Sequence, residues 1–152
     1  ATQVFRLQWA GEPQLARSES FMVYVNQIPV RLQNVRHAVQ VVSSMGVVVN
    51  VAPPSGMPDL KLVGTSVVKE KGKRFPAITV ENPTNIHALL PESKIVLTAG
   101  SWSRTIEPNE ISTQIGVGLV EPGKRRRFVL PVDLPPGVGQ IHASVEFKPS
   151  RR

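Results

Sequence analysis

The chain has 152 residues, 41% of them hydrophobic and 5% aromatic, so it is long enough to bury a core made mainly of aliphatic side chains. The absence of cysteine excludes disulfides, thiolate catalysis and sulfur-ligated metal sites, and the absence of any 18-residue apolar run predicts that no membrane span is present. The net charge of +7 predicts a solvated basic surface that meets an acidic partner.

The 14 prolines and 11 glycines lie between short apolar runs, which is typical of an all-β fold. In chain order, we expect strands at residues 4–9 and 20–28, and then one unusually long strand at residues 38–51, where apolar side chains recur at every second position. One face of the long strand would contain Val39, Val41, Ser43, Met45, Val47, Val49 and Val51. Because an isolated hairpin is marginal in water, these strands should expose apolar faces unless something covers them.

A proline-rich run at residues 53–58 predicts a linker, and short strands separated by turn signals follow it. Turn signals at about every 8–12 residues predict an immunoglobulin-like β-sandwich. We therefore expect two parts, residues 1–53 and residues 54–152. The strands of the second part are expected at residues 60–69, 75–82, 86–90, 94–98, 105–106, 114–120, 125–131 and 140–147. The glycines at 116 and 118 predict a bulge or a close backbone approach.

Three stretches carry a resemblance to a known family. They are residues 18–29, which begin with Ser-Glu-Ser and end with Ile-Pro, the alternating residues 39–51 before Pro53, and the Asn-Pro-Thr corner at residues 82–84. In this order they resemble the PapD-like periplasmic chaperones of the chaperone–usher pathway, and residues 28–32 resemble the archaic branch. The resemblance implies two immunoglobulin-like domains, of which residues 1–53 would supply the last strands of the first and residues 54–152 the complete second.

The resemblance also implies a function. Such proteins are non-enzymatic chaperones of the periplasm, which cap pilus (fimbrial) subunits by donor-strand complementation and deliver them to an outer-membrane usher. The donor residues here would be Val39, Val41, Ser43 and Met45, whereas Val47, Val49 and Val51 would pack inside their own sandwich. The early strands of the first domain have no counterpart in this sequence, so either the chain is a trimmed fragment, or a separate polypeptide supplies these strands, or the chain pairs with a copy of itself.

The family also holds the C-terminal carboxylate of the subunit with a basic pair in the cleft between the domains. By alignment from Pro53, the position of the family's lysine on the last strand is occupied here by Val48. Arg6 and Arg36 are therefore the candidate anchors, and each is also compatible with an ordinary surface position.

Two other functions fit the sequence: a structural pilin-like or adhesin-like subunit, and a carbohydrate-binding module that uses Trp102 and Trp9. No enzyme, cofactor or metal site is indicated, because the three histidines, at positions 37, 87 and 142, lack ligand spacing and no nucleophile elbow is present. Nucleic acid is not expected as a partner, because Phe75 and Phe128, which follow the two internal basic runs, are expected core residues.

Overall fold

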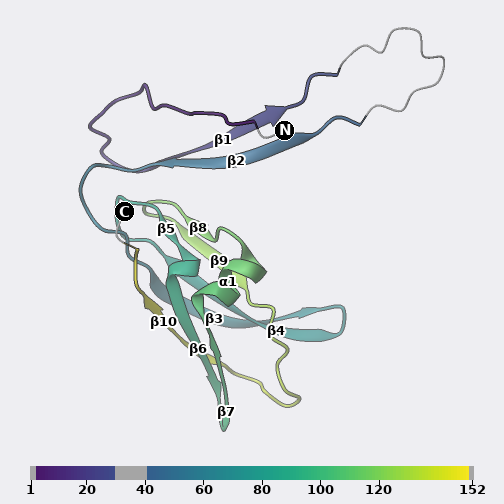
Figure 1. Cartoon of the computed structure of the whole chain (residues 1–152). Helices are drawn as coiled ribbons and strands as arrows, with labels where there is room; N and C mark the ends of the chain where they lie inside the picture. Colours follow the sequence, from purple (N-terminus) through teal and green to yellow (C-terminus); the bar gives the residue numbers. More distant parts are fainter. Residues whose placement is uncertain (1–2, 30–40, 151–152) are drawn as a thin grey trace, which may run out of the picture.

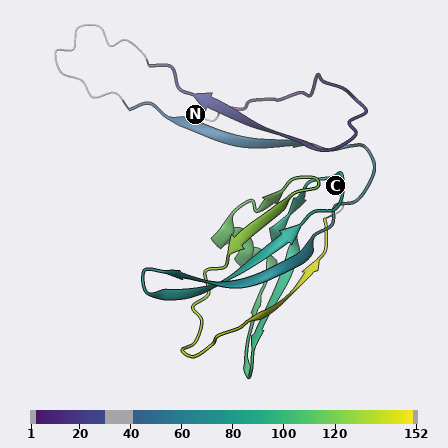
Figure 2. The ribbon, with the colours of Figure 1, turned by 180° about the vertical axis from the view of Figure 1, so that it is seen from behind.

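The computed structural model describes residues 3–29 and 41–150 of the chain. Its strands form antiparallel sheets, and it has one short α-helix, so the expected all-β sandwich is confirmed. Figure 1 and Figure 2 show a two-stranded ribbon that lies across one end of a β-sandwich. No helix in the described ranges is long and apolar enough to cross a membrane.

The sandwich contains one sheet in the order β3-β4-β9, a second in the order β10-β6-β7, and a short pair, β5-β8. A one-turn 3₁₀ helix, η1, and the helix α1 lie between its strands. The elements are β3 (Lys61–Glu70), β4 (Lys73–Glu81), β5 (Ala88–Leu89), η1 (Leu90–Glu92), β6 (Ser93–Ala99), β7 (Trp102–Ile106), α1 (Pro108–Ile115), β8 (Leu119–Val120), β9 (Arg125–Val129) and β10 (His142–Phe147).

The core of the sandwich is almost entirely aliphatic, as the low aromatic content predicts. Alternate residues of the central strands point inward: Ile78 and Val80 on β4, and Ile95 and Leu97 on β6, are all fully buried. Phe128 on β9, in the same sheet as β4, adds an aromatic side chain to this core. Burial of each such side chain stabilises the fold by about 1.5–3 kcal/mol, so this part of the chain has a core of its own.

The ribbon consists of β1 (Glu19–Asn26) and β2 (Ser44–Val51), which pair antiparallel from Glu19 opposite Val51 to Asn26 opposite Ser44. Two side-chain hydrogen bonds clamp its ends: Ser20 Oγ donates to Asn50 Oδ1 at 2.8 Å, and Ser44 Oγ donates to Asn26 Oδ1 at 2.5 Å. Within residues 3–29 and 41–57, only Ser18 is buried. The ribbon therefore has no core of its own.

Two of the predicted strands in the first part differ in the structure. Residues 4–9 form no strand: no neighbouring strand pairs with them, and Trp9 instead donates its Nε1–H to the Glu12 carbonyl. The long strand is also shorter than predicted, because β2 begins at Ser44, opposite the last residue of β1. Residues 41–43 precede it without strand structure, and residues 38–40 lie outside the described residues.

A strand predicted at residues 114–120 is also wrong, because most of this region is α1 and the turn that follows it. Pro108 occupies the first turn of the helix, where its fixed φ is favourable and no N–H is needed. Ile111 is buried in the core beneath the helix. Gly116, at φ 78°, ends the helix, so only Leu119 and Val120 remain as strand.

The predicted close approach at the glycine pair is confirmed at Gly118, which has φ 56°. A Cβ there would lie 2.9 Å from Leu90 Cβ and from Pro91 Cδ, so Gly118→Ala should lower the free energy of unfolding by about 2–3 kcal/mol. Gly100→Ala is the matched control: it has nearly the same positive φ, 59°, but no atom lies within 4 Å, so only the backbone cost of about 1 kcal/mol should remain. Urea unfolding of both variants measures the difference, and equal losses would contradict the close contact.

Candidate functional site

The two faces of the β1–β2 ribbon differ in chemistry. Directly opposite residues of an antiparallel pair project to the same side, so the register assigns each side chain to a face. One face, here called the apolar face, consists of Phe21, Val23, Val25, Met45, Val47, Val49 and Val51, with Glu19 opposite Val51 at its end. The other, the mixed face, consists of Ser20, Met22, Tyr24, Asn26, Ser44, Gly46, Val48 and Asn50.

Much of the apolar face is open to solvent. Met45 is 60% exposed, Val47 42% and Phe21 40%, and the other valines of this face are half-buried. Trp9 partly covers one end, with its ring centroid 5.5 Å from that of Phe21. A row of exposed apolar side chains along a strand pair is characteristic of an interaction surface.

Both edges of the ribbon are also free, since no third described strand pairs with β1 or β2. Proteins usually protect such edges with charged residues, proline or a bulge. β2 contains none of these: its sequence from Ser44 to Val51 has no charge and no proline, and its pairing with β1 has no register shift. A partner strand can therefore pair with the free edge of β2 through backbone hydrogen bonds. Other parts of the same partner can then contact the apolar face.

Of the predicted donor residues that the structure describes, only one lies on β2. Met45 lies on β2 within the apolar face. Ser43 precedes β2, and its carbonyl accepts the Gln27 N–H at 2.8 Å. Val41 is 79% exposed, and Val39 lies outside the described residues. Val47, which was expected inside a sandwich, lies beside Met45 on the same exposed face. The β1 members of the face are an addition from the structure, although the alternation at residues 21, 23 and 25 carries their signal.

A groove lies at the base of the ribbon, where it meets the turn after β8. This base groove has a volume of about 340 Å³. Its lining residues are Arg17, Ser18, Glu19, Ser20, Phe21, Glu121, Pro122 and Lys124. The predicted anchor Arg6 is exposed, belongs to no strand and does not line it, and Arg36 lies outside the described residues. The basic residues that line it are Arg17, which precedes β1, and Lys124, which follows the turn after β8, and the sequence analysis assigned neither of them as an anchor.

Ser18 joins the ribbon to the sandwich. Its N–H donates to the Asn85 carbonyl at 2.8 Å, and its Oγ accepts the backbone N–H of His87 at 3.0 Å. The same Oγ lies 3.0 Å from His87 Nδ1, and both residues are buried. Asn85 Nδ2 also donates to the Ala16 carbonyl at 2.9 Å. These contacts, made just before β1 begins, fix the direction in which the ribbon leaves the sandwich.

Ser18→Ala should therefore broaden the orientation of the ribbon without unfolding the sandwich, because it removes both hydrogen bonds of the hydroxyl but no core residue. The chain has no cysteine, so Tyr24→Cys and Ser144→Cys give two specific spin-label positions, one on β1 and one on β10. The distance distribution between the labels should widen in Ser18→Ala. Ser20→Ala, which loses a hydrogen bond within the ribbon, should leave the distribution unchanged. An unchanged distribution in Ser18→Ala would contradict the role of this joint.

The described residues offer little for other chemistries. No group of three or more His, Cys, Asp or Glu side chains in residues 3–29 and 41–150 is arranged to hold a metal ion. Trp102 packs against the core, which disfavours a carbohydrate platform at this residue. Phe128 is buried and Phe75 half-buried, which leaves neither free to stack on a nucleic-acid base.

Comparison with protein-family models, with curated proteins and with solved structures found no match to this chain. The apolar face, the free edges of the ribbon and the base groove are therefore the features from which a function can be inferred.

Proposed function

We propose that this protein is a periplasmic chaperone that caps pilus (fimbrial) subunits by donating strand β2 and delivers them to an outer-membrane usher. One observation carries the proposal: a ribbon with an exposed apolar face and two free edges, held at a fixed joint on a sandwich that has its own core. The order of the motifs at residues 18–29, 39–51 and 82–84, which resembles the PapD-like chaperones, supports it independently.

The mechanism follows from the chemistry of the ribbon. A pilus subunit of this kind lacks its last strand, and its groove exposes core side chains. The free edge of β2 would supply backbone hydrogen bonds. Val41, Met45 and Val47 would enter pockets of the subunit, with Ser43 as a weak anchor between the first two. Each buried side chain contributes about 1.5–3 kcal/mol, so three anchors and a backbone ladder suffice for stable capture.

The base groove would receive the end of the subunit. Arg17 and Lys124 both line it and would hold the C-terminal carboxylate by charged hydrogen bonds, each contributing about 1.5–3 kcal/mol. Glu19 and Glu121 line the same groove and reduce its positive potential. The carboxylate would therefore fix the register of the bound strand more than it would add affinity.

The part of the apolar face that the subunit would not cover, which includes Phe21, Val23 and Val49, also fits the inside of an immunoglobulin-like first domain. In that arrangement β1 and β2 would be its last strands, and further strands from a separate polypeptide segment or from a second copy would complete it. The sandwich after Pro58 would be the second domain. The protein would act without catalysis and without a cofactor.

Co-expression tests the proposal. The chain would be secreted into the periplasm of a bacterium together with an archaic-type pilus subunit from which the N-terminal extension has been removed. A chaperone should yield a soluble one-to-one complex by light scattering, whereas the subunit alone should aggregate or be degraded. If the chain instead assembles into fibres by itself, the structural-subunit alternative is correct. If the subunit is equally soluble without the chain, the proposal is wrong.

A further inference from the structure

Four consecutive basic residues lie at the start of β9, an edge strand of its sheet. Residues 124–127 are all exposed. Arg125 forms an ion pair with Glu81, with 3.1 Å between Nη2 and Oε2. Within the described part of the chain, Lys124, Arg126 and Arg127 form no ion pair. The edge of β9 therefore carries uncompensated positive charge.

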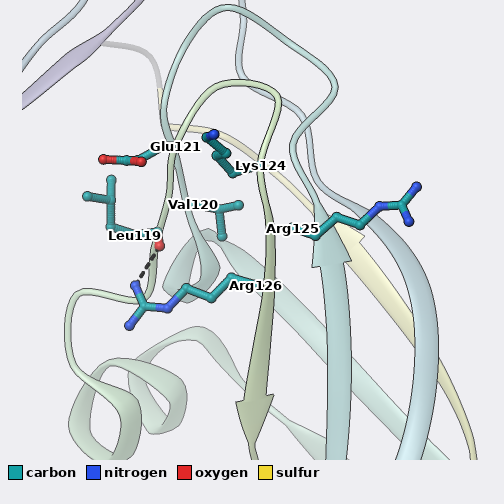
Figure 3. A pocket seen from close by; sticks show the side chains of 6 residues that line it. All are labelled: Leu119, Val120, Glu121, Lys124, Arg125 and Arg126. Carbon is teal, nitrogen blue, oxygen red and sulfur yellow. Dashed lines mark hydrogen bonds between the residues drawn. The ribbon is translucent and has the colours of Figure 1, made fainter.

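Arg126 is held in place without being neutralised. Its Nη1 donates to the Leu119 carbonyl at 2.6 Å, and its guanidinium lies 4.9 Å from the centroid of the Phe128 ring. Figure 3 shows Arg126 pointing toward Leu119 while Arg125 points away to the other side. Charges that only protect a strand edge from aggregation need no fixed position, whereas a preorganised guanidinium is suited to binding a carboxylate.

The charged edge is continuous with the base groove. A second groove of about 350 Å³ runs beside β8 and β9, and its lining residues are those in Figure 3: Leu119, Val120, Glu121, Lys124, Arg125 and Arg126. Glu121 and Lys124 line both grooves, and Phe21 of the apolar face lines the base groove. A chain segment bound along the apolar face can thus continue past Lys124 to Arg126.

We propose that Lys124 and Arg126 form a second docking site, the basic shelf, for an acidic segment of the same protein partner whose strand pairs with the ribbon. The inference rests on the proposed function only for the pairing of the partner's strand with the ribbon. We commit to a protein partner rather than a nucleic acid, because the shelf adjoins an apolar face that suits apolar side chains and because neither Phe128 nor Phe75, the aromatic residues after the two basic runs, is free to stack on a base. A partner that presents apolar residues next to carboxylates would contact both surfaces at once, which accounts for the position of the shelf beside the groove.

The test uses the full chain and fluorescent peptides of alternating valine and threonine, with both ends blocked so that no terminal carboxylate is present. Each peptide ends in a short tail of glutamate, serine or lysine. The glutamate-tailed peptide should bind about 3- to 10-fold more tightly than the serine-tailed one at low salt, because two exposed charge pairs are gained. The advantage should fall as the salt concentration rises.

The double variant Lys124→Gln/Arg126→Gln should bind the glutamate-tailed peptide no more tightly than the serine-tailed one. Because Arg126 also contacts Leu119 and Phe128, the single variant Lys124→Gln, which leaves those contacts intact, should lose about half of the advantage on a logarithmic scale. The control Lys61→Gln/Arg127→Gln removes the same charge from residues of the same sheet that do not line the groove, and should keep the advantage.

The remaining outcomes separate the two proposals. Equal binding of the glutamate-tailed and serine-tailed peptides would overturn the basic shelf and leave the strand-binding ribbon standing. Failure of all three peptides to bind would overturn both. A single-stranded oligonucleotide is the last probe. If it binds more tightly than the glutamate-tailed peptide, and if Lys124→Gln/Arg126→Gln abolishes that binding, the shelf is a nucleic-acid site and the proposed partner is wrong.

Discussion

Met45→Asp should weaken capture of a pilus subunit by at least about 100-fold while leaving the sandwich as stable as before. The methionine is exposed on the apolar face, and under the proposed mechanism it enters a pocket of the partner. A carboxylate buried there without a partner costs several kcal/mol, and about 2.7 kcal/mol already corresponds to 100-fold in affinity. The ribbon contributes no side chain to the core of the sandwich, so thermal unfolding should not change. Titration of the capped complex measures the affinity.

Met22→Asp is the matched control. It makes the same chemical change at a residue with nearly the same exposure, 53%, but on the mixed face of the ribbon. If only the apolar face enters the subunit, Met22→Asp should weaken capture by no more than about 10-fold, which corresponds to about 1.4 kcal/mol. Equal losses in the two variants would contradict donation through one face, and undiminished capture by Met45→Asp would contradict the donor strand itself.

The strands of the sandwich could largely be predicted from the sequence, because their signals are local. Period-two apolar runs bounded by glycine and proline turns predicted β3, β4, β6, β9 and β10 to within a few residues at each end. The aliphatic core followed from the composition, and Ile78 and Leu97 lie in it as their patterns require. The faces of the ribbon were equally predictable, since alternation alone places Met45, Val47 and Val49 on one side.

The errors occurred where a local pattern needs a distant partner. Residues 4–9 alternate in hydrophobicity like a strand, but a strand also needs a neighbour to pair with, and no described strand pairs with them. Residues 108–115 became a helix because Ile111 packs into the core and because Pro108 suits the first turn. The spacing of Ile111 and Ile115 carried that signal, but the glycines after it resembled a strand with a bulge.

The base groove and the basic shelf could not be predicted at all. Arg17 and Lys124 are far apart in sequence but line the same groove. Ser18, next to Arg17, forms hydrogen bonds with the segment after Asn82. Lys124 follows a turn whose Gly123 N–H donates to the carbonyl of the same asparagine. No periodicity encodes such an arrangement. It depends on the polar side chains that fix loops against one another, and a single sequence gives no means to pair them.

Asn82 is the most connected of these residues, and it is fully buried. Its Nδ2 donates to the carbonyls of Ile86, at 2.7 Å, and of Val120, at 3.0 Å. Its Oδ1 accepts the N–H of Thr84 at 3.0 Å and the hydroxyl of the same residue at 2.8 Å. Its backbone carbonyl accepts the Gly123 N–H at 2.9 Å. One amide thus joins the loop that carries His87 to the turn that carries Lys124.

Asn82→Ala should lower the free energy of unfolding by about 3–5 kcal/mol, because it leaves two buried carbonyls without that donor and each such loss costs about 1–3 kcal/mol. That is a large part of the 5–15 kcal/mol typical of a domain. Subunit capture should weaken as well, since both walls of the base groove depend on this corner. The control Asn50→Ala, on the half-buried ribbon pair with Ser20, should cost less than about 1 kcal/mol. Urea unfolding measures both losses, and a loss below 1 kcal/mol for Asn82→Ala would contradict the role of the amide.

Asn82→Asp tests the same donors through pH. The new side chain has the same shape, but at neutral pH it turns a carboxylate oxygen toward the two carbonyls that now receive an N–H. Burial and these dipoles would raise the pKa of the introduced carboxyl above its unfolded value, so the folded state would bind a proton more tightly than the unfolded state. Stability should therefore increase as the pH falls through the folded pKa, because the protonated carboxyl regains one donor, and it should be lost again as the pH rises. Urea unfolding between pH 4 and pH 8 against the wild type isolates this dependence, and a variant that becomes more stable as the pH rises would show that Asn82 does not donate to these carbonyls.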